Sequence, residues 1–204
     1  IEEEYWDKRQ LVKKINLNSL YGAILNPGCR FFDNRIGQST TLTGRAIARH
    51  MASKVNEIIT GEADHVGRAI IYGDTDSCYF SAYATLKKDI EKGLIPWNRE
   101  SVIELYDTIG ETVNGTFVKF MQDAFHVPRT RAEVIKAGRE IVASKGLFIT
   151  KKRYAVLYYD KEGKRKDVGS PGEVKAMGLD LKRADTPEFM QKFLEEVLLM
   201  LLTG

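Results

Sequence analysis

Apolar residues recur at helical spacing in three stretches of the chain. The first covers residues 2–25 and predicts a helix that ends near Leu25, before a loop at residues 26–28. A second helix is expected from about Thr40 to Ile59, where Thr60 and Gly61 end it. A third is expected over residues 102–125. The pattern therefore predicts three long helices before residue 126.

Runs of β-branched and aromatic residues predict short strands between and after these helices. Residues 69–72 and 78–82 flank a tight turn with Asp74 and Asp76, which indicates a hairpin with an acidic tip. Two further strands are expected over residues 133–142 and 147–159, separated by a turn at 144–146. A last helix follows Pro187. The fold class is therefore α+β, with a small antiparallel sheet that carries the acidic hairpin and long helices packed on one face.

Composition is that of a globular protein. The chain has 204 residues, 43% of them hydrophobic, which is enough for a substantial core. The apolar run at residues 197–202 is much shorter than the stretch of about 20 residues that crosses a bilayer, so no membrane association is expected. Cys29 and Cys78 are too few for a disulfide framework, which indicates a reducing, cytoplasmic setting.

Positive charge is concentrated in one segment. Residues 136–183 contain 13 Lys and Arg against 6 Asp and Glu, whereas residues 1–135 contain 17 against 18. Such a segment could follow a phosphate backbone, or it could be a solvated hairpin, and charge alone favours the solvated hairpin.

The two carboxylates of the hairpin tip are the first chemical signal. Asp74 and Asp76 could converge on a divalent cation with hard oxygen ligands, for which magnesium is the natural candidate. Taken alone, an Asp-x-Asp pair is more often a turn former, because Asp side chains form hydrogen bonds with nearby backbone groups.

Two longer strings change this interpretation. The hairpin tip reads Tyr72-Gly73-Asp74-Thr75-Asp76-Ser77, and the first helix contains Lys14-x-x-x-Asn18-Ser19-x-Tyr21-Gly22. Together they resemble two signature regions of family B DNA polymerases of the T-even bacteriophage type, in the same order. The resemblance continues at Lys151-Lys152-Arg153-Tyr154 and is weakest over residues 83–130. It implies the C-terminal part of a palm domain over residues 26–183, with the end of the fingers at 1–25 and the start of the thumb at 184–204.

The resemblance implies a role for each carboxylate of the site. Asp76 matches the aspartate that binds both catalytic metals, two Mg²⁺ ions in the complete enzyme, and Asp74 matches its supporting neighbour. Thr75 lies between them and is expected beside the primer. Glu140 aligns with a further family carboxylate near the metals, although Arg139 precedes it where relatives often carry an acidic residue.

The resemblance also implies a nucleotide site on the first helix. Lys14, Asn18 and Tyr21 recur every three or four residues and so share one helical face. Lys14 would hold the triphosphate, Asn18 would shape the same pocket and Tyr21 would lie beneath the nascent base pair. Gly22 would permit close approach. Without the motif, core packing of Tyr21 and a solvated Lys14 would be the simpler interpretation.

The basic strand is expected to hold the primer. Lys151, Lys152 and Arg153 match the segment that grips the primer strand near its growing end, and Tyr154 matches a residue beside it. Contacts of this kind position DNA without reading its sequence. The expected partners are therefore primer-template DNA and deoxynucleoside triphosphates.

The resemblance leaves parts of a polymerase unaccounted for. The family's Asp-x-x-Ser-Leu-Tyr-Pro-Ser motif, with the second catalytic aspartate, should lie upstream of Ile1. Most of the fingers, the exonuclease and nearly all of the thumb are also missing. We therefore expect the isolated chain to be inactive until the remaining polymerase portion is supplied, in cis or as a separate subunit.

Two other functions compete with this one. The chain could be a non-catalytic DNA- or nucleotide-binding subunit of a split replicative polymerase. It could also be another palm-type nucleotidyl enzyme such as a cyclase, against which the Asn18-Ser19-x-Tyr21-Gly22 string argues.

Overall fold

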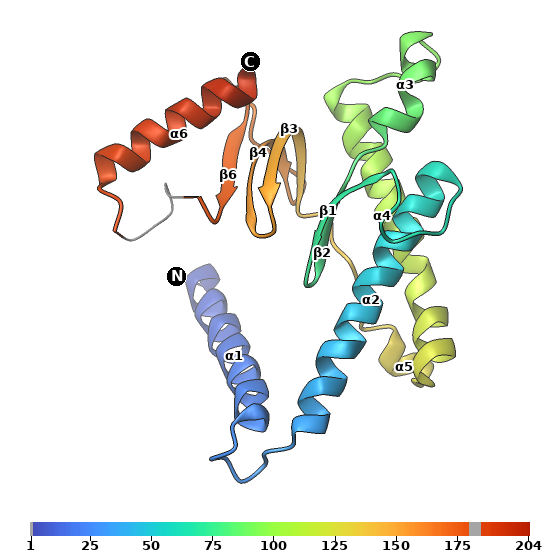
Figure 1. Cartoon of the computed structure of the whole chain (residues 1–204), viewed down its shortest axis with the longest axis vertical. Coiled ribbons are helices and arrows are strands. Elements are labelled where there is room, and N and C mark those ends of the chain that lie inside the picture. The colour runs from blue at the N-terminus through green and yellow to red at the C-terminus, as the bar shows by residue number, and fades with distance from the viewer. Residues whose placement is uncertain (1, 180–184) are drawn as a thin grey trace. The chain divides into compact units, whose positions relative to one another are not determined.

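The computed structural model describes residues 2–179 and 185–204 (Figure 1). Contacts along the chain divide it into two compact units. Unit 1 ends at Arg49, and unit 2 runs from His50 to Gly204. Runs of helices and runs of antiparallel strands follow one another along the chain, which confirms the α+β class. The predicted boundary between palm and thumb, after residue 183, lies outside the described residues.

Unit 1 consists of α1 (Glu2–Leu25) and the first half of α2 (Asn34–Thr60). The predicted end of the first helix at Leu25 is confirmed, but α2 begins well before Thr40. Asp33 is the reason, because its Oδ1 accepts the backbone N–H groups of Arg35 (2.8 Å) and Ile36 (3.4 Å) and so caps the new helix. Gly37 faces the side chain of Leu25: a Cβ there would lie 1.9 Å from Cδ2 of Leu25, so that side chain would have to move.

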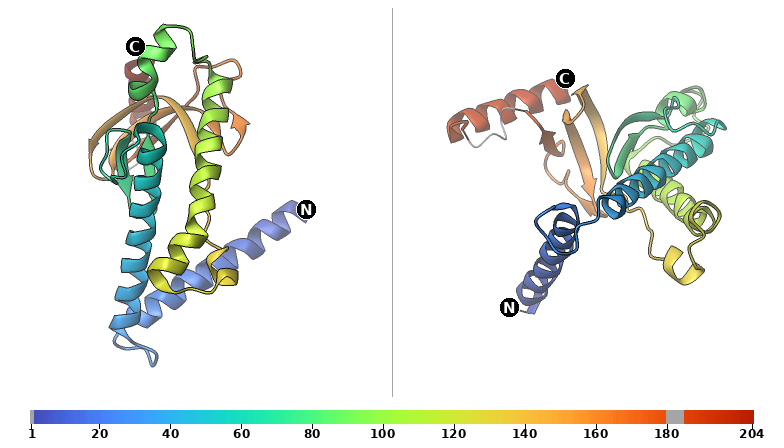
Figure 2. Two further views of the ribbon diagram at one scale, coloured as in Figure 1. Left: turned by 90° about the vertical axis from the view of Figure 1, so that its right-hand side faces the viewer. Right: turned by 60° about the horizontal axis from the view of Figure 1, so that its bottom comes forward.

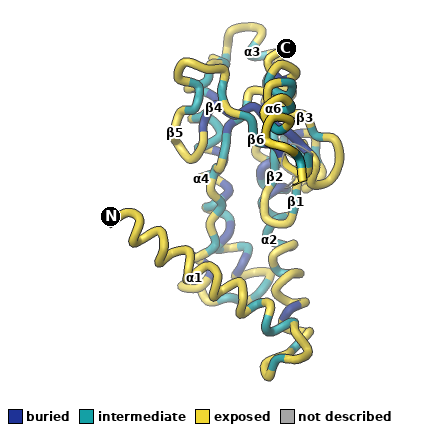
Figure 3. The backbone as a smooth tube through the Cα atoms, turned by 90° about the vertical axis from the view of Figure 1, so that its left-hand side faces the viewer, coloured by how far each residue is buried: buried dark blue, intermediate teal, exposed yellow. Residues whose placement is uncertain are grey.

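The residues of α1 are open to solvent along most of the helix (Figure 3). Every residue from Glu2 to Leu20 is exposed, including large apolar side chains that would normally be covered. These are Tyr5, Trp6, Leu11, Val12, Ile15, Leu17 and Leu20. The apolar positions that predicted the helix therefore do not form a core within unit 1.

Unit 2 contains two separate antiparallel sheets. Among the described residues, β1 (Ile70–Asp74) pairs only with β2 (Ser77–Phe80), so the acidic hairpin forms a sheet of its own. In the larger sheet, β4 (Arg153–Lys161) pairs with β3 (Ile141–Thr150), β5 (Lys164–Arg165) and β6 (Glu173–Met177). The acidic hairpin was expected in the same sheet as these strands, and backbone pairing separates them.

The strand boundaries around the basic segment differ from the prediction. Residues 133–140 form no strand, and the predicted turn at 144–146 lies inside β3. The register of β3 against β4 shifts between Val142 and Lys145, which is the behaviour of a β-bulge. A bulge lets a strand carry Ser-Lys-Gly without turning. The chain turns instead at Lys151 and Lys152, between the paired residues Thr150 and Arg153.

Four helices complete unit 2 within the described residues: α3 (Tyr83–Glu91), α4 (Arg99–Phe125), α5 (Arg129–Ala132) and α6 (Glu188–Thr203). The long helix predicted over residues 102–125 is confirmed as α4. It starts at Arg99 because the side chain of Asn98 accepts the N–H of Ser101 (2.9 Å). The short helix α3 was not predicted. None of the described helices combines the length and the apolar character needed to cross a membrane.

The larger sheet is covered on both sides (Figures 1 and 2). Val102 of α4 packs with Val142 and Tyr159 on one side. On the other side, α6 packs through Leu202 on a cluster of Ala155, Leu157 and Ala176. We expected helices on one face only, and α6 supplies the second layer. β4 is the most buried strand of the sheet, because it is also paired along both edges, with β3 on one and with β5 and β6 on the other.

The second half of α2 anchors the chain just before the acidic hairpin. The side chain of Asn56 is fully buried, donates to the carbonyl oxygen of Glu62 (2.7 Å) and accepts the N–H of Ala69 (3.0 Å). Its amide therefore joins the end of α2 to the residue that precedes β1. On the same helix, His50 stacks on Phe120 of α4 with ring centroids 4.0 Å apart. Burial lowers the pKa of His50, which is consistent with a structural role.

Candidate functional site

The acidic hairpin presents one carboxylate that is free to bind a ligand. Asp74 pairs with Ser77 across the strands, so Thr75 and Asp76 form the turn. The carboxylate of Asp74 is half-buried and accepts the hydroxyl of Thr75 (3.0 Å). Asp76 is exposed and has no hydrogen-bond or ion-pair partner in the described part of the chain. Its oxygens are therefore available to a cation.

The backbone at the hairpin tip is strained. Thr75 has a φ of 32°, although β-branched residues rarely adopt positive φ. Strain of this kind costs on the order of 1–3 kcal/mol and is concentrated at functional sites. Its position between Asp74 and Asp76 supports a functional role for this turn.

A basic turn lies directly beside the acidic tip. Lys151 and Lys152 connect β3 to β4, and the backbone N–H of Lys152 donates to the hydroxyl of Tyr72 on β1 (2.7 Å). The Nζ of Lys152 lies 3.9 Å from Oδ2 of Asp74. With Lys152 about two-thirds exposed, this ion pair contributes at most about 1 kcal/mol. The hydrogen bond to Tyr72 is therefore the firmer link between the two turns.

An aromatic cluster joins the two hairpins beneath their tips. It consists of Tyr72, Tyr79, Phe148 and Tyr154, whose neighbouring ring centroids lie 5.2 to 6.3 Å apart. The hydroxyl of Tyr79 donates to that of Tyr154 (3.4 Å). Burial, and then this hydrogen bond, raise the pKa of Tyr79, so the phenol stays protonated. The ring of Tyr154, expected beside the primer, is 9% exposed and packs within this cluster.

The third predicted metal ligand has a cation partner of its own. Glu140 Oε1 lies 2.6 Å from Nζ of Lys175, and Arg139 is engaged by Asp107 and Asp160. Within the described ranges, no group of three or more His, Cys, Asp or Glu side chains is arranged to hold a metal. Asp74 and Asp76 supply oxygens of the type that Mg²⁺ prefers, but only part of an octahedral shell. The role of Glu140 stays a prediction.

The predicted nucleotide-binding residues lie in unit 1 on α1. Because residues 2–25 are helical, Lys14, Asn18 and Tyr21 do share one face, as their spacing predicts. Lys14, Asn18 and Gly22 are exposed and Tyr21 is half-buried. The face is therefore open to a ligand, and its role stays a prediction.

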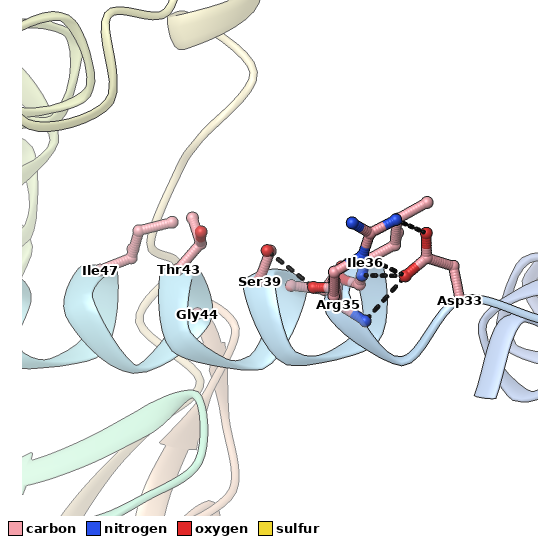
Figure 4. Close-up of a pocket in the computed structure, with 8 residues that line it drawn as sticks. Asp33, Arg35, Ile36, Ser39, Thr43, Gly44 and Ile47 are labelled. Atoms are coloured by element: carbon pink, nitrogen blue, oxygen red, sulfur yellow. Dashed lines mark hydrogen bonds and ion pairs between the residues drawn. The ribbon is translucent and has the colours of Figure 1, made fainter.

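Unit 1 also has a broad concave surface along the start of α2 (Figure 4). Its lining residues are Asp33, Arg35, Ile36, Ser39, Thr40, Thr43, Gly44 and Ile47. Hydrogen bonds from Arg35 lower the pKa of Asp33. The hydroxyls of Ser39 and Thr40 donate to carbonyl oxygens of their own helix (2.8 and 2.9 Å). Much of its polar lining is thus already paired, and no predicted site residue lines it.

The contact of Tyr72 with the basic turn was not predicted from the sequence, although the residue is part of the hairpin string. Tyr72 and Asp74 are two residues apart on a strand, so they point to the same face, and both contact Lys152. That alternation was the available signal. The nearby Cys78 has a pKa raised by burial to about 11, so its thiol stays protonated and packs as an apolar group.

Comparison with known proteins matches the part of the sequence that contains the acidic hairpin to a protein family. The model of DNA polymerase family B matches residues 1–93, which include both the α1 string and the acidic hairpin. The DNA-directed DNA polymerases of Escherichia phage RB69 and Enterobacteria phage T4 are each 30% identical to the chain, over 197 and 203 residues. DNA polymerase II of Escherichia coli (strain K12) is 39% identical over 66 residues, which are 32% of the chain.

The chain belongs to DNA polymerase family B. Within that family, it is similar over 92% of its length to the polymerases of the T-even phage type. The matched region spans 21% of the length of those two relatives.

Proposed function

We propose that the chain is the palm part of a template-directed DNA polymerase, with the end of the fingers at residues 1–25 and the start of the thumb at 184–204. The observation that supports this proposal most strongly is the position of Asp76. It has no partner among the described residues, and it lies in a strained turn beside the basic Lys151-Lys152 turn. A nucleotidyl transferase needs both, because it must bind cations and a phosphate backbone within a few ångströms of each other.

The proposed reaction is nucleotidyl transfer to a primer. The primer 3′-hydroxyl attacks the α-phosphate of a deoxynucleoside triphosphate, a new O–P bond forms, the bond to the β-phosphate oxygen breaks, and pyrophosphate leaves. The hydroxyl proton is released to solvent. Two Mg²⁺ ions, when bound, stabilise the charge on the attacking and leaving oxygens.

Each carboxylate of the hairpin has a separate task in this proposal. Asp76 would ligate the metals, because its oxygens have no other partner in the described part of the chain. Asp74 would orient the turn, since it accepts the Thr75 hydroxyl and lies near Lys152. Glu140 would contribute only after release from Lys175. Asp76 is therefore the catalytic residue of this chain.

The nucleotide and the primer would be held by different elements. The exposed face of α1 would bind the incoming nucleotide, with Lys14 on the triphosphate and Tyr21 beneath the base pair. The basic turn would hold the primer phosphates, assisted by Arg153, whose Nε donates to the carbonyl oxygen of Gly178 (3.2 Å). Template pairing would supply specificity, as expected for an enzyme whose own contacts are to the backbone. The reaction would take place in the cytoplasm of a bacterium or of a phage-infected host.

The first test of this proposal is whether the isolated chain extends a primer. A single catalytic aspartate supplies too few oxygens for two metals, so the 204-residue chain alone should not extend a labelled primer. Extension should appear when the segment with the Asp-x-x-Ser-Leu-Tyr-Pro-Ser motif is supplied with the fingers. A control in which that motif's aspartate is changed to alanine should remain inactive. Robust extension by the purified chain alone would contradict the proposal.

A non-catalytic role in DNA or nucleotide binding is the alternative. It is favoured by the concentration of basic residues in 136–183, which binding alone would explain. The two functions predict different effects of Asp76→Asn on primer extension and on DNA binding. Loss of primer extension with retained DNA binding supports catalysis.

A further inference from the structure

The backbone of the basic turn is held in an uncommon conformation. Lys152 has a φ of 62°, in the left-handed region that few residues other than glycine adopt. For a residue other than glycine this conformation has a cost in free energy, which a hydrogen bond to the turn can offset. Within the described residues, its N–H is bound by a side chain from another sheet, the hydroxyl of Tyr72 at 2.7 Å.

The opposite side of the same residue is closed by Gly178. A Cβ at Gly178 would lie 2.1 Å from the carbonyl oxygen of Lys152, and Gly178 itself has a φ of 62°. Only glycine permits both the conformation and the approach. Lys152 is thus held between the Tyr72 hydroxyl on its N–H side and Gly178 on its carbonyl side.

The phenol of Tyr72 is itself fixed. Its ring lies among Tyr79, Phe148 and Tyr154, at centroid distances of 6.3, 5.5 and 5.4 Å. Because Tyr72 and Asp74 are on the same face of β1, the hydroxyl that holds the basic turn moves together with the acidic hairpin. The Tyr72 hydroxyl is therefore a direct link from the acidic hairpin to the basic turn, beside the aromatic contacts that join the two hairpins.

We propose that Tyr72 is a positioning residue of the polymerase: its hydroxyl, with Gly178 opposite, fixes the Lys151-Lys152 turn at the distance from Asp74 and Asp76 that aligns the primer phosphates with the catalytic metals. This inference rests on the proposed function. In this proposal Tyr72 contacts neither DNA nor nucleotide. It acts by fixing the position of Lys151 and Lys152.

Replacement of Tyr72 by Phe tests this proposal with little change in packing. Tyr72→Phe removes the hydroxyl and keeps the ring in its cluster. In the reconstituted polymerase, KM for primer-template should rise about fivefold, the value of one hydrogen bond of about 1 kcal/mol. The association constant for primer-template falls with salt, and the slope of its logarithm against log salt concentration should decrease in magnitude by about 0.9 for each phosphate that the displaced lysines no longer neutralise. A purely structural role would not change that slope.

The matched control is Tyr79→Phe. It removes a hydroxyl from the same cluster, which bonds to Tyr154 and not to the basic turn. KM for primer-template and the salt slope should stay at the wild-type values. In a Lys151→Ala, Lys152→Ala background, Tyr72→Phe should have no additional effect, because the groups it positions are absent. Equal behaviour of Tyr72→Phe and Tyr79→Phe would overturn the proposal, as would full additivity in that background.

A measurement without catalysis separates this inference from the proposed function. Amide hydrogen exchange at Lys152 in the 204-residue chain should be faster in Tyr72→Phe and unchanged in Tyr79→Phe. Equal exchange in both variants would remove the contact on which the inference rests. Failure of the proposed function has a different signature, in which the wild-type assembly neither binds nor extends primer-template while the Lys152 amide keeps its dependence on Tyr72.

Discussion

Replacement of Asp76 by Asn should lower primer extension by at least about a thousandfold in the reconstituted polymerase. The amide keeps the size of the side chain and removes the charge that would bind the metals in the proposed reaction. Metal ions supply several kcal/mol to transfer reactions of this type, and about 4 kcal/mol corresponds to three factors of ten in rate. Single-nucleotide addition measured at saturating Mg²⁺ and nucleotide checks the result.

The same variant should bind primer-template as well as the wild type. Asp76 is exposed and has no partner among the described residues, so its neutralisation disturbs no contact of the fold. Asp74→Asn should have a smaller effect, because that carboxylate supports the turn. Asp123→Asn, on the exposed side of α4, is the matched control and should extend primers normally. Extension by Asp76→Asn within about tenfold of wild type would exclude Asp76 as the catalytic ligand.

Replacement of Arg139 by Ala should destabilise unit 2 by about 3–5 kcal/mol. Arg139 bridges Asp107 and Asp160, and the Asp160 side chain is only 2% exposed. Removal of Arg139 leaves the buried carboxylate of Asp160 without a cation, and an unpaired buried charge is strongly destabilising. The only other hydrogen bond that the structure describes for this carboxylate comes from the N–H of Gly163 (3.1 Å). Urea unfolding followed by fluorescence of Trp97, which packs on the core of α4 and the sheet, measures the change.

Two comparisons make the Arg139 result specific. The measurement is best done in a Trp6→Phe background, because the other tryptophan lies in unit 1. Arg129→Ala breaks an exposed pair with Glu133 and should cost less than about 1 kcal/mol. Asp160→Asn should recover part of the stability in the Arg139→Ala background, since it removes the stranded charge. Similar destabilisation by Arg139→Ala and Arg129→Ala would show that the buried cluster is not important for stability.

The acidic hairpin could be predicted from the sequence because its pattern is local. Two short apolar runs around Gly73 to Asp76 define a turn, and the strand period places Asp74 on a face without any long-range information. The same is true of α4, whose buried residues recur at helical spacing. α1 was also predicted as a helix, although its apolar residues do not gather on one face of the folded helix. The family resemblance then supplied the proposed roles of these local elements.

The arrangement around the basic turn could not be predicted, because it depends on contacts distant in sequence. The turn at Lys151-Lys152 has no Gly, Asn or Pro to mark it, and its conformation is stabilised by Tyr72, 80 residues away along the chain. A bulge in β3 concealed the true boundary, and Ser144-Lys145-Gly146 was mistaken for a turn. The early start of α2 was different, because Asp33 was a readable cap that the prediction overlooked.

Asp76 at the acidic tip is proposed to bind the catalytic metals, and the face of α1 that carries Lys14 and Tyr21 is proposed to bind the incoming nucleotide. A structure of the reconstituted polymerase with primer-template, deoxynucleoside triphosphate and Mg²⁺ tests this central claim most directly. We predict an oxygen of Asp76 about 2.1 Å from Mg²⁺, Lys14 Nζ about 3 Å from a triphosphate oxygen, and Tyr21 beneath the new base pair. Asp76 turned to bulk solvent, or Lys14 and Tyr21 on the side of the protein away from the nucleotide, would contradict the claim.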